Sequence, residues 1–430
     1  MKTAGVPSLD RVRMEALQLE KLQRLLALVS EDNPFYSAKL RKAGVRPHVA
    51  SLEEFLTTTP FTHKTEIVDN QAQYPPYGSN LTYPLDRYIR FTQTSGTTGR
   101  PIRWLDTREN WEWMIDCWVR VYESARARPG DRVFFPFSFG PFLGFWIAFE
   151  AAAKIGCLAI SGGGMRSAAR IQTILDNEVT ILCSTPSYAL HLAEVARDDG
   201  LDLRQSKVRA IILAGEPGGS LPSTRALIER LWPGACVVDH HGMTEIGPVS
   251  YECPERPGTL HIMEAGYLPE IIDPATQEQL GPGERGELVL TNLGRVGSPL
   301  IRYRTGDIVH RASDLVCRCG SSEMALEGGI LARTDDMLIV RGVNVYPGAV
   351  EEILRSCGVT EFRVEVYVER ALAEMKIEIE PDPSDPNPDH LVDRTAAALL
   401  NTLGFRVTVS CVSCGSLPRF EGKARRWLRA

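Results

Sequence analysis

The segment from Phe91 to Pro101, Phe-Thr-Gln-Thr-Ser-Gly-Thr-Thr-Gly-Arg-Pro, combines residue types that can bind a phosphate group. Its glycines allow backbone N–H groups to converge, its hydroxyl side chains add donors, and its arginine adds positive charge. The segment does not fit the Walker A pattern, because only two residues separate its glycines. An ordinary polar turn is the competing interpretation. The candidate contacts are Thr94, Ser95, Gly96, Thr97, Thr98, Gly99 and Arg100.

Four cysteine and histidine residues could form a second kind of site. Cys317 and Cys319 belong to a Cys-x-Cys-Gly turn, in which the glycine lets metal donors converge. Together with Cys253 and His261 they would supply three thiolates and one imidazole, the closed tetrahedral set of a structural Zn²⁺ site. The spacing is unlike that of a zinc finger, so four unbound side chains are the alternative.

Composition excludes several classes of protein. Hydrophobic residues make up 43% and charged residues 24% of the 430 residues, which excludes a disordered or fibrous chain. The 48 basic and 54 acidic residues give a net charge of −6, which disfavours a nucleic-acid partner. No apolar run reaches the roughly 18–20 residues of a membrane span, and the N-terminus becomes charged too early for a signal peptide. We therefore expect a cytoplasmic protein without a membrane partner.

The framework that positions these side chains is predicted from residues 130–240. Short apolar runs at 132–137, 179–183, 208–213 and 235–238 alternate with helical patterns at 166–177, 187–199 and 221–231. This alternation predicts an α/β unit with a largely parallel sheet. The apolar spacing over residues 8–30 predicts an amphipathic opening helix that ends at Asn33-Pro34.

The C-terminal part follows a different pattern. Apolar and charged residues alternate from 362 to 369, and a strand near 375–379, a helix near 391–402 and a strand near 405–412 follow. This order predicts a small α+β domain. We predict a large domain over residues 1–334, a hinge at 335–336 and the small domain over 337–430.

Five segments, taken in order, resemble the motifs of the adenylate-forming superfamily, which includes acyl-CoA ligases and peptide-synthetase adenylation domains. They are the phosphate loop at 94–101, an adenine and magnesium motif at 241–245, a ribose motif at 303–307, a hinge segment at 333–347 and a last motif at Gly422-Lys423. The segments 337–347, 260–262 and 269–274 are most similar to the phenylacetate-CoA ligase-like branch.

The resemblance implies an α/β fold, with a large N-terminal adenylate-forming domain of β-sheets and packed helices, and a small mobile α+β C-terminal domain. It also implies ATP-dependent activation of an aromatic carboxylic acid to an acyl-adenylate, then transfer to coenzyme A with release of AMP and pyrophosphate. The implied ATP and AMP contacts, besides the phosphate loop, are Gly215, Glu216, Pro217, His240, His241, Gly242, Met243, Thr244, Asp307 and Arg333.

Each implied role suits the chemistry of its side chain. Glu245 would bind Mg²⁺, which prefers hard oxygen ligands, and Thr244 would hydrogen-bond the α-phosphate. Asp307, which only accepts hydrogen bonds when ionised, suits the ribose hydroxyls, although alone it could be a turn residue. His241 stands where the family often has tyrosine, and Arg100 replaces the more familiar lysine.

The resemblance assigns the catalytic role to Lys423 together with Thr244 and Glu245. Lys423 would bridge the substrate carboxylate and the α-phosphate, whereas a solvated basic terminus is the alternative. When the thiol enters, a mobile small domain would turn, so that Lys423 leaves the active site and another face of the small domain takes its place. The implied hinge is Asp335, and the implied coenzyme A path is lined by Arg341, Gly342, Val343, Asn344 and Tyr346.

The acyl pocket is assigned by position within the family. Phe137 and Phe142 would face the substrate ring, with Ala214 and Gly215 beyond it, although aromatic residues beside a strand are also typical of a plain core. The resemblance also favours zinc at Cys253, His261, Cys317 and Cys319.

Other functions remain open on the sequence alone. A stand-alone adenylating enzyme that passes the acyl group to a carrier-protein thiol or an amine would share the first half-reaction. A non-catalytic nucleotide-binding protein is the third hypothesis, which the joint presence of Glu245, Asp307 and Lys423 disfavours. The expected ligands are an aromatic acid, ATP, Mg²⁺, coenzyme A and a structural Zn²⁺, and a homodimer is a further expectation.

Overall fold

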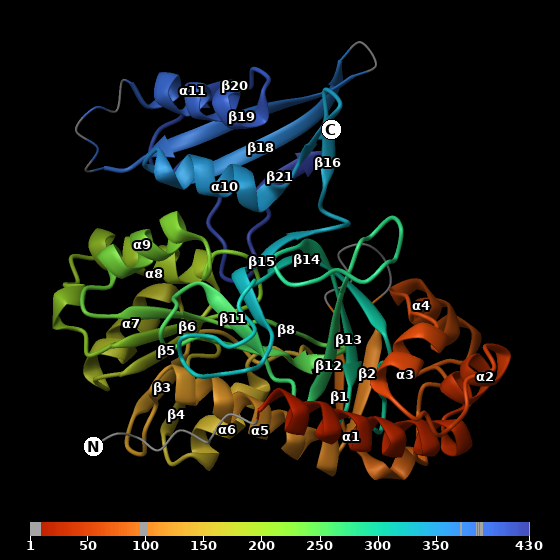
Figure 1. Ribbon diagram of the computed structural model, residues 1–430. Coiled ribbons are helices and arrows are strands. Elements are labelled where there is room, and N and C mark those ends of the chain that lie inside the picture. Colours follow the sequence, from red (N-terminus) through yellow and green to blue (C-terminus); the bar gives the residue numbers. More distant parts are fainter. Residues whose placement is uncertain are drawn as a thin grey trace.

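The computed structural model describes residues 10–94, 101–369, 372–383, 385, 387 and 390–429. A large body contains the described residues up to about Arg333, and a smaller C-terminal part lies at one end of it (Figure 1). Within the described chain, no helix has both the length and the apolar character to cross a bilayer.

A parallel sheet with helices on both faces is one of the two larger sheets of the large body. Its strand order is β4-β3-β5-β6-β7, and all of its pairs are parallel. The strands are β3 (Arg132–Phe135), β4 (Leu158–Ser161), β5 (Ile181–Ser184), β6 (Ala210–Leu213) and β7 (Cys236–Asp239). The helices are α5 (Arg108–Ser124), α6 (Trp146–Lys154), α7 (Ser167–Asp176), α8 (Pro186–Asp198) and α9 (Pro222–Leu231). The predicted α/β unit is confirmed.

Alternate residues of these strands belong to two different cores, because successive side chains of a strand point to opposite faces. On β3, Val133 and Phe135 pack with α5 and α6, whereas Phe134 packs with α7, α8 and α9. The same alternation holds for β5 and β6. The sheet is therefore buried on both faces, which is why its strands are short, continuous apolar runs.

An antiparallel sheet lies beside the parallel one and was not predicted from the sequence. Its order is β10-β11-β15-β14-β13-β12. The strands are β10 (Ser250–Glu252), β11 (Thr259–Ile262), β12 (Tyr267–Ile272), β13 (Arg285–Asn292), β14 (Tyr303–Arg311) and β15 (Ala325–Arg333). Every residue of β12 is buried, so the strand shows no alternation of polar and apolar residues from which it could have been recognised.

Helices from the N-terminus cover one side of this sheet. They are α1 (Arg11–Asp32), α2 (Pro34–Lys42), α3 (Leu52–Thr58) and α4 (Lys64–Gln73). Asp10 caps α1, and Asn33 ends it while its side chain accepts a hydrogen bond from the Tyr36 N–H at the start of α2. Leu22, Leu25 and Leu26 of α1 are buried in one core with Leu268 of β12. The predicted opening helix is confirmed.

Short elements complete the large body. The pair β1 (Tyr88–Gln93) and β2 (Arg103–Thr107) flanks the phosphate loop, and β8 (Gly242–Met243) pairs with β9 (Gly247–Pro248). Two single 3₁₀ turns are η1 (Leu85–Arg87) and η2 (Leu203–Gln205).

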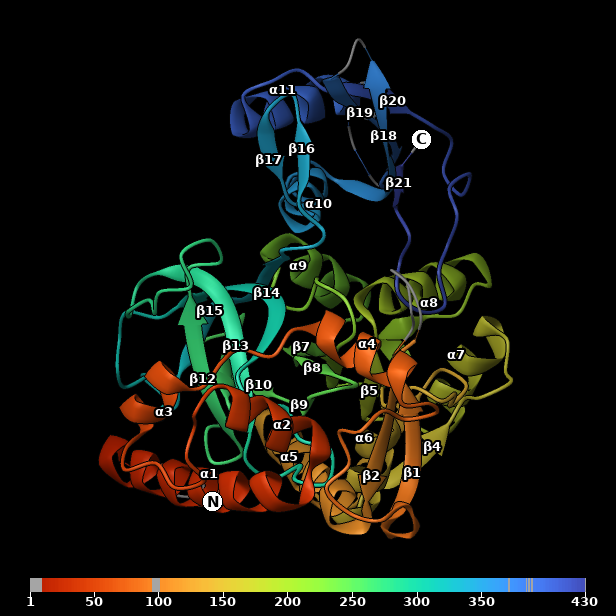
Figure 2. The same ribbon diagram turned by 90° about the vertical axis from the view of Figure 1, so that its right-hand side faces the viewer.

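The C-terminal part has its own sheet and its own core. Its elements are β16 (Leu338–Val340), β17 (Val343–Val345), α10 (Pro347–Ser356), β18 (Val359–Glu369), β19 (Leu372–Pro381), α11 (Leu391–Leu403), β20 (Thr408–Cys411) and β21 (Trp427–Arg429). The sheet order is β20-β19-β18-β21. Figure 2 shows the tail between β20 and β21 running down toward α8 of the large body. The fold class is the predicted one.

Candidate active site

The phosphate loop begins and ends on the β1–β2 pair. The Thr94 N–H donates to the Ile102 carbonyl at 2.9 Å, and the Ile102 N–H donates to the Thr94 hydroxyl at 3.0 Å. These two bonds close the base of the loop. The other predicted contacts, Ser95, Gly96, Thr97, Thr98, Gly99 and Arg100, lie outside the described residues, so their role stays a prediction.

Asp307 lies at the centre of a chain of charged groups. It is buried on β14, where it pairs in register with Arg333 of β15. The Arg333 guanidinium donates to Asp307 Oδ1 at 2.8 Å, and His241 Nε2 lies 3.0 Å from Asp307 Oδ2. Arg333 Nε also donates to Asp335 Oδ1 at 2.8 Å. The fold thus connects three predicted nucleotide contacts with the predicted hinge residue.

These contacts keep the Asp307 carboxylate ionised. Burial by itself would raise its pKa, but the hydrogen bond and charge of His241 and the charge of Arg333 outweigh burial and lower that pKa below the ordinary value. An ionised carboxylate only accepts hydrogen bonds, so His241 Nε2 must be the protonated nitrogen that donates to it. Asp307 can therefore accept from the hydroxyls of a sugar.

Glu245 is buried and is held by a residue that the sequence analysis had not assigned a role. The Tyr303 hydroxyl donates to Glu245 Oε1 at 3.1 Å. Tyr303 begins the same Tyr-Arg-Thr-Gly-Asp segment that ends in Asp307, so its place in that motif was the signal that could have identified it. β14 therefore positions both carboxylates, Asp307 directly and Glu245 through Tyr303.

Thr244 is supported by a fully buried ion pair. Arg295 forms two hydrogen bonds with Asp106 on β2, at 2.6 and 2.7 Å, and its Nη1 donates to the Thr244 carbonyl at 2.7 Å. Both charged side chains are inaccessible to solvent. No sequence signal joins Arg295 to Asp106, which lies 189 positions earlier.

His240 is a core residue next to the candidate site. Burial lowers its pKa to about 3, so the ring is neutral. Its Nδ1 lies 2.7 Å from the Ser250 carbonyl, which only accepts, so Nδ1 carries the proton. The ring packs on Trp118 with a centroid separation of 4.5 Å. This tilted ring contact, together with the Ser250 hydrogen bond, holds the start of the segment that continues through His241, Gly242 and Met243 to Thr244.

Lys423 reaches the candidate site from the C-terminal tail. Its Cε lies 3.7 Å from the position that a Cβ at Gly215 would occupy. The side chain still contacts solvent, but desolvation between the two parts lowers its pKa. The negative charges of Glu216, Glu245 and Asp307 act in the opposite direction. The pKa of Lys423 is thus influenced by carboxylates from three segments that lie far from it in the sequence.

The segment 214–217 lies after β6 and contacts the tail. Glu216 accepts hydrogen bonds from the Ser187 N–H at 2.8 Å and from the Ala424 N–H at 2.7 Å. Gly215 has a positive φ of 96°, a conformation that favours glycine. Pro217 is exposed, and Ala214 is partly buried against the core that the parallel sheet forms with α5 and α6. Contact of this segment with a nucleotide stays a prediction.

The predicted acyl-binding phenylalanines have different surroundings. Phe137 is partly buried against the core that the parallel sheet forms with α5 and α6, and it stacks on Phe145, with ring centroids 5.0 Å apart. Phe139 lies beside it at 5.9 Å. Phe142 has 48% of its surface exposed and lies outside that cluster as defined by the described residues. Contact of Phe137, Phe142, Ala214 and Gly215 with an acyl group stays a prediction.

The predicted coenzyme A path lies on the C-terminal part. Arg341 and Gly342 form the exposed turn between β16 and β17 and have positive φ values of 50° and 78°. Arg341 pairs with Glu374 of β19 at 2.8 Å. Val343 and Asn344 are exposed on β17, and Tyr346 precedes α10. In this domain orientation the segment belongs to the small part's own surface, so its role stays a prediction.

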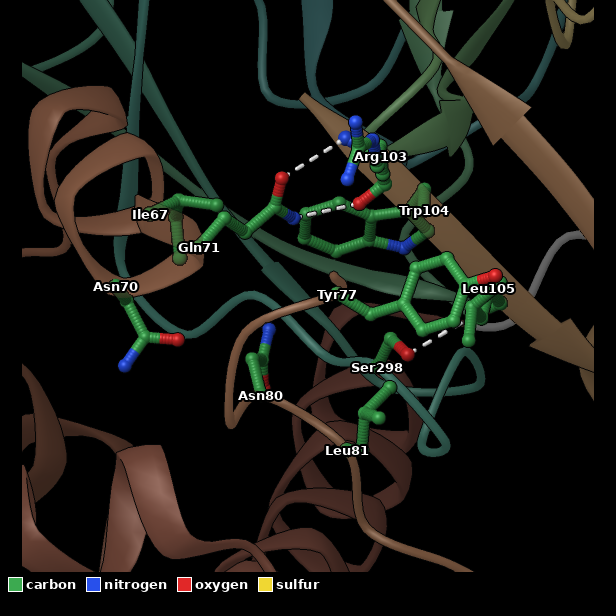
Figure 3. Close-up of a pocket in the computed structure, with 10 residues that line it drawn as sticks. All are labelled: Ile67, Asn70, Gln71, Tyr77, Asn80, Leu81, Arg103, Trp104, Leu105 and Ser298. Carbon is green, nitrogen blue, oxygen red and sulfur yellow. Dashed lines mark hydrogen bonds between the residues drawn. The ribbon is translucent and has the colours of Figure 1, made fainter. Parts of the chain in front are cut away.

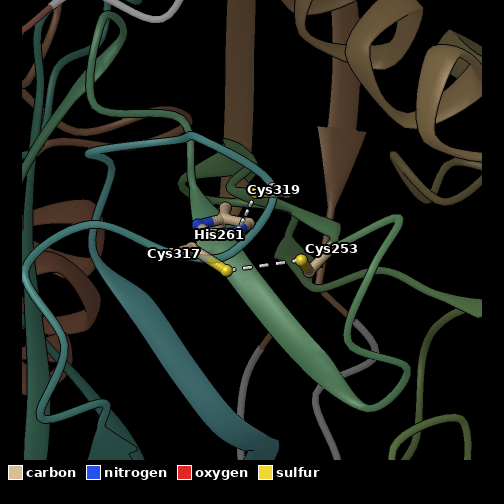
Figure 4. A group of neighbouring side chains, drawn as sticks. All are labelled: Cys253, His261, Cys317 and Cys319. Carbon is tan, nitrogen blue, oxygen red and sulfur yellow. Dashed lines mark hydrogen bonds between the residues drawn. The ribbon is translucent and has the colours of Figure 1, made fainter.

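The four cysteine and histidine ligands predicted for zinc lie together (Figure 4). Their ligand atoms are all within 4.8 Å of one another, with Cys253 Sγ 3.6 Å from Cys317 Sγ and Cys319 Sγ 3.4 Å from His261 Nε2. Tetrahedral ligands with Zn–S bonds of about 2.3 Å lie roughly 3.4–3.8 Å apart. His261 Nδ1 lies 3.2 Å from the Glu323 carbonyl, which leaves Nε2 toward the sulfurs. These residues therefore fit a structural zinc ion.

Two cavities lie outside these clusters. Figure 3 shows the smaller one, of about 10 Å³, where the Gln71 side chain forms hydrogen bonds of 2.6 and 3.0 Å with the backbone of Arg103. It has room for about one water molecule. A neighbouring cavity of about 260 Å³ is lined by Gln93, Pro101 and Ile102 at the ends of the phosphate loop, among other residues. Among the described residues, none of those predicted for the site lines either cavity.

Comparison with known proteins identifies relatives along nearly the whole chain. A family model described as AMP-binding enzyme matches residues 37–294, and one described as AMP-binding enzyme C-terminal domain matches residues 342–429. The phenylacetate-coenzyme A ligase of Thermus thermophilus is 34% identical, covering 98% of this chain and 97% of that protein. The enzyme of the same name from Escherichia coli is 31% identical, covering 99% and 96%.

Solved structures are similar over the whole chain as well. A 2-hydroxyisobutyryl-CoA ligase in the postadenylation state with 2-HIB-AMP has a TM-score of 0.93 at 28% identity, covering 100% of this chain and 94% of that one. The same ligase in the thioesterification state, with 2-HIB-AMP and CoA, has a TM-score of 0.74 at 30% identity, covering 98% and 91%. The arrangement of the two parts here is thus more similar to that of the postadenylation state.

Proposed function

Because the chain belongs to the AMP-binding enzyme family and is an AMP-forming acid–thiol ligase, which joins a carboxylic acid to coenzyme A through an acyl-adenylate, we propose that its acid is aromatic. The proposal rests on the relatives named phenylacetate-coenzyme A ligase and on the aromatic cluster of Phe137, Phe139 and Phe145. Flat aromatic side chains are good partners for an aromatic ring.

The approach of Lys423 to the segment after β6, with its Cε 3.7 Å from the position of a Cβ at Gly215, is the observation that carries the catalytic proposal. In the first half-reaction a carboxylate oxygen of the acid attacks the α-phosphorus of ATP, and the bond to the leaving pyrophosphate breaks. Two anions must meet, so a fixed cation between them lowers the barrier. We assign that role to the Lys423 ammonium, with the Thr244 hydroxyl as a donor to the α-phosphate.

The nucleotide contacts are assigned from the same geometry. Asp307 accepts from the ribose hydroxyls while Arg333 and His241 hold its two oxygens in place. The His241 ring offers a flat face for adenine. Oε1 of Glu245 accepts from Tyr303, and Oε2 is the oxygen proposed for Mg²⁺, which when bound neutralises phosphate charge.

The second half-reaction requires a different arrangement of the two parts. The coenzyme A thiol, after losing its proton, attacks the acyl carbon, and AMP leaves with the electron pair of the broken bond. We propose that the small part, residues 337–430, turns about Asp335 and Asp336, which removes Lys423 and brings the segment 341–346 to the pantetheine arm. Lids and domains that close over successive steps commonly act in this way.

We propose a structural zinc ion at Cys253, His261, Cys317 and Cys319. A site with four protein ligands has no open position for substrate, so the ion would join the loop after β10 to the loop between β14 and β15. Transfer of the acyl group to a carrier-protein thiol or an amine, in place of coenzyme A, is the alternative, and a homodimer stays a prediction.

A second candidate substrate is a small branched hydroxy acid, because the similar solved structures are named 2-hydroxyisobutyryl-CoA ligase. The test is a product assay with ATP, Mg²⁺ and coenzyme A, offering phenylacetate, benzoate and 2-hydroxyisobutyrate separately and measuring AMP and the CoA thioester. We expect the highest kcat/KM with an aromatic acid. Preference for 2-hydroxyisobutyrate would contradict the aromatic assignment, and thioester formation only on a carrier protein would contradict the acceptor.

A further inference from the structure

We infer that Glu216 is a positioning residue that holds the Lys423 segment in the adenylating orientation by bridging two backbone N–H groups, one from each part of the molecule. This inference rests on the proposed role of Lys423. It gives Glu216 a role other than the nucleotide contact that the family resemblance implies.

Both carboxylate oxygens of Glu216 are used. Oε1 accepts from the Ser187 N–H in the first turn of α8, and Oε2 accepts from the Ala424 N–H in the tail, at 2.8 and 2.7 Å. A carboxylate at a helix N-terminus is favourably placed, because the N–H groups there lack partners within the helix. Glu216 is thereby fixed to the large body and offers its second oxygen to the tail.

The tail contact lies next to the catalytic lysine. Ala424 directly follows Lys423, and the carbonyl of the preceding Gly422 accepts from the Thr185 hydroxyl at 3.3 Å. The backbone on each side of Lys423 is thus held by the same short stretch of the large body, Thr185–Ser187 with Glu216. Because Gly422 and Ala424 are already held, the backbone of Lys423 loses less conformational entropy when the lysine binds the substrate.

Other contacts between the two parts are made by side chains, among them the pair of Arg170 and Glu421, two residues before the lysine, at 3.2 Å. Arg419 pairs with Glu194 on α8, Arg230 on α9 pairs with Asp382, and the Ser223 hydroxyl donates to Glu352 on α10. These contacts involve side chains on both parts and leave the backbone at 422–424 untouched. They support the orientation of the small part in general, whereas Glu216 acts on the lysine itself.

The Glu216 contact depends on the domain orientation. If the small part turns for thioester formation, the Ala424 N–H moves away from Glu216 while the bond to Ser187 can remain. The carboxylate should therefore favour adenylation and contribute nothing to thioester formation. A general structural role predicts equal effects on both half-reactions.

The decisive variant is Glu216→Gln, because the glutamine amide has one acceptor oxygen and cannot accept from both N–H groups. We expect ATP–pyrophosphate exchange to fall at least tenfold, mainly in kcat, with thioester formation from supplied acyl-adenylate and coenzyme A within twofold of wild type. Glu194→Gln, which removes an ion pair between the two parts away from the lysine, is the matched control and should change exchange less than threefold.

A double-mutant cycle separates this inference from the proposed function. If Glu216 acts through Lys423, Glu216→Gln should have no further effect on exchange in a Lys423→Ala background. Additive losses, equal losses in both half-reactions, or wild-type exchange in Glu216→Gln would each overturn the inference. Wild-type exchange in Lys423→Ala alone would overturn the proposed function instead. Thermal unfolding of Glu216→Gln within a few degrees of wild type shows that the variant is folded.

Discussion

The imidazole Nε2 of His241 lies 3.0 Å from Oδ2 of Asp307, so the residue predicted to face adenine and the residue predicted to bind ribose form one hydrogen-bonded unit. His241 comes from the segment before β8 and Asp307 from β14. Arg333 holds the other oxygen of the same carboxylate. The nucleotide would therefore meet a carboxylate whose orientation is already fixed.

This unit predicts the effect of His241→Phe, which keeps a flat ring and removes the hydrogen bond. A hydrogen bond to a charged group contributes about 1.5–3 kcal/mol, so we expect the KM for ATP to rise about tenfold. The KM for the acid should change little. ATP titrations of the exchange reaction provide the measurement, and an unchanged KM for ATP would show that the His241 contact does not support nucleotide binding.

Replacing Lys423 by alanine tests the cation between carboxylate and phosphate. Loss of one transition-state donor costs about 10²–10³-fold in rate, so ATP–pyrophosphate exchange should fall by that factor. Thioester formation from supplied acyl-adenylate should be spared. Lys207→Ala, at an exposed lysine near β6, is the control and should exchange normally. Exchange at the wild-type rate in Lys423→Ala would remove Lys423 from the mechanism.

The pH dependence of adenylation should reflect Lys423. Desolvation lowers its pKa, and the charged form is the active one, so activity should be lost as pH rises through a value below that of an ordinary lysine. Lys423→Arg keeps its charge to higher pH, so any remaining alkaline decline should move upward. Rates of exchange between pH 7 and pH 10.5 measure both. The same alkaline decline in both proteins would assign it to another group.

The zinc proposal predicts about one equivalent of metal per chain after gentle purification. Cys253→Ser and Cys319→Ser should each lose the metal and lower the Tm by several degrees, because the energy of metal binding is part of the folding energy of such sites. Cys236→Ser, at an exposed cysteine outside the cluster, is the matched control. Elemental analysis with less than half an equivalent of zinc in the wild-type protein would refute the site.

The buried pair of Arg295 and Asp106 predicts a large loss of stability in Arg295→Met. That change leaves a buried carboxylate without its partner, which costs about 3–5 kcal/mol, and it removes the donor to the Thr244 carbonyl. Urea unfolding measures the loss, and Arg108→Met at an exposed position of α5 should be nearly neutral. A loss of stability below about 1 kcal/mol would show that water enters the space left by the Arg295 guanidinium.

Parts of the fold could be predicted because their patterns are local. The strands of the parallel sheet alternate with helices along the chain, and the spacing of the apolar residues indicates each of them. In β18, polar residues alternate with apolar ones. The sheet from β10 to β15 could not be predicted in this way. Two of its neighbouring strands, β12 and β13, are buried on both faces, so a periodic signal that distinguishes one face from the other is lost there.

The sequence by itself determined the chemistry available: a glycine- and hydroxyl-rich loop, two carboxylates in recognisable motifs, a lysine near the end, and four metal-binding side chains. These properties belong to single residues and short segments, so they need no fold. Only the tertiary structure decided which groups meet, as Glu216 meets the Ala424 N–H and Arg295 meets Asp106. Such contacts join residues far apart in the chain, and their energies depend on distance and burial, which packing alone establishes.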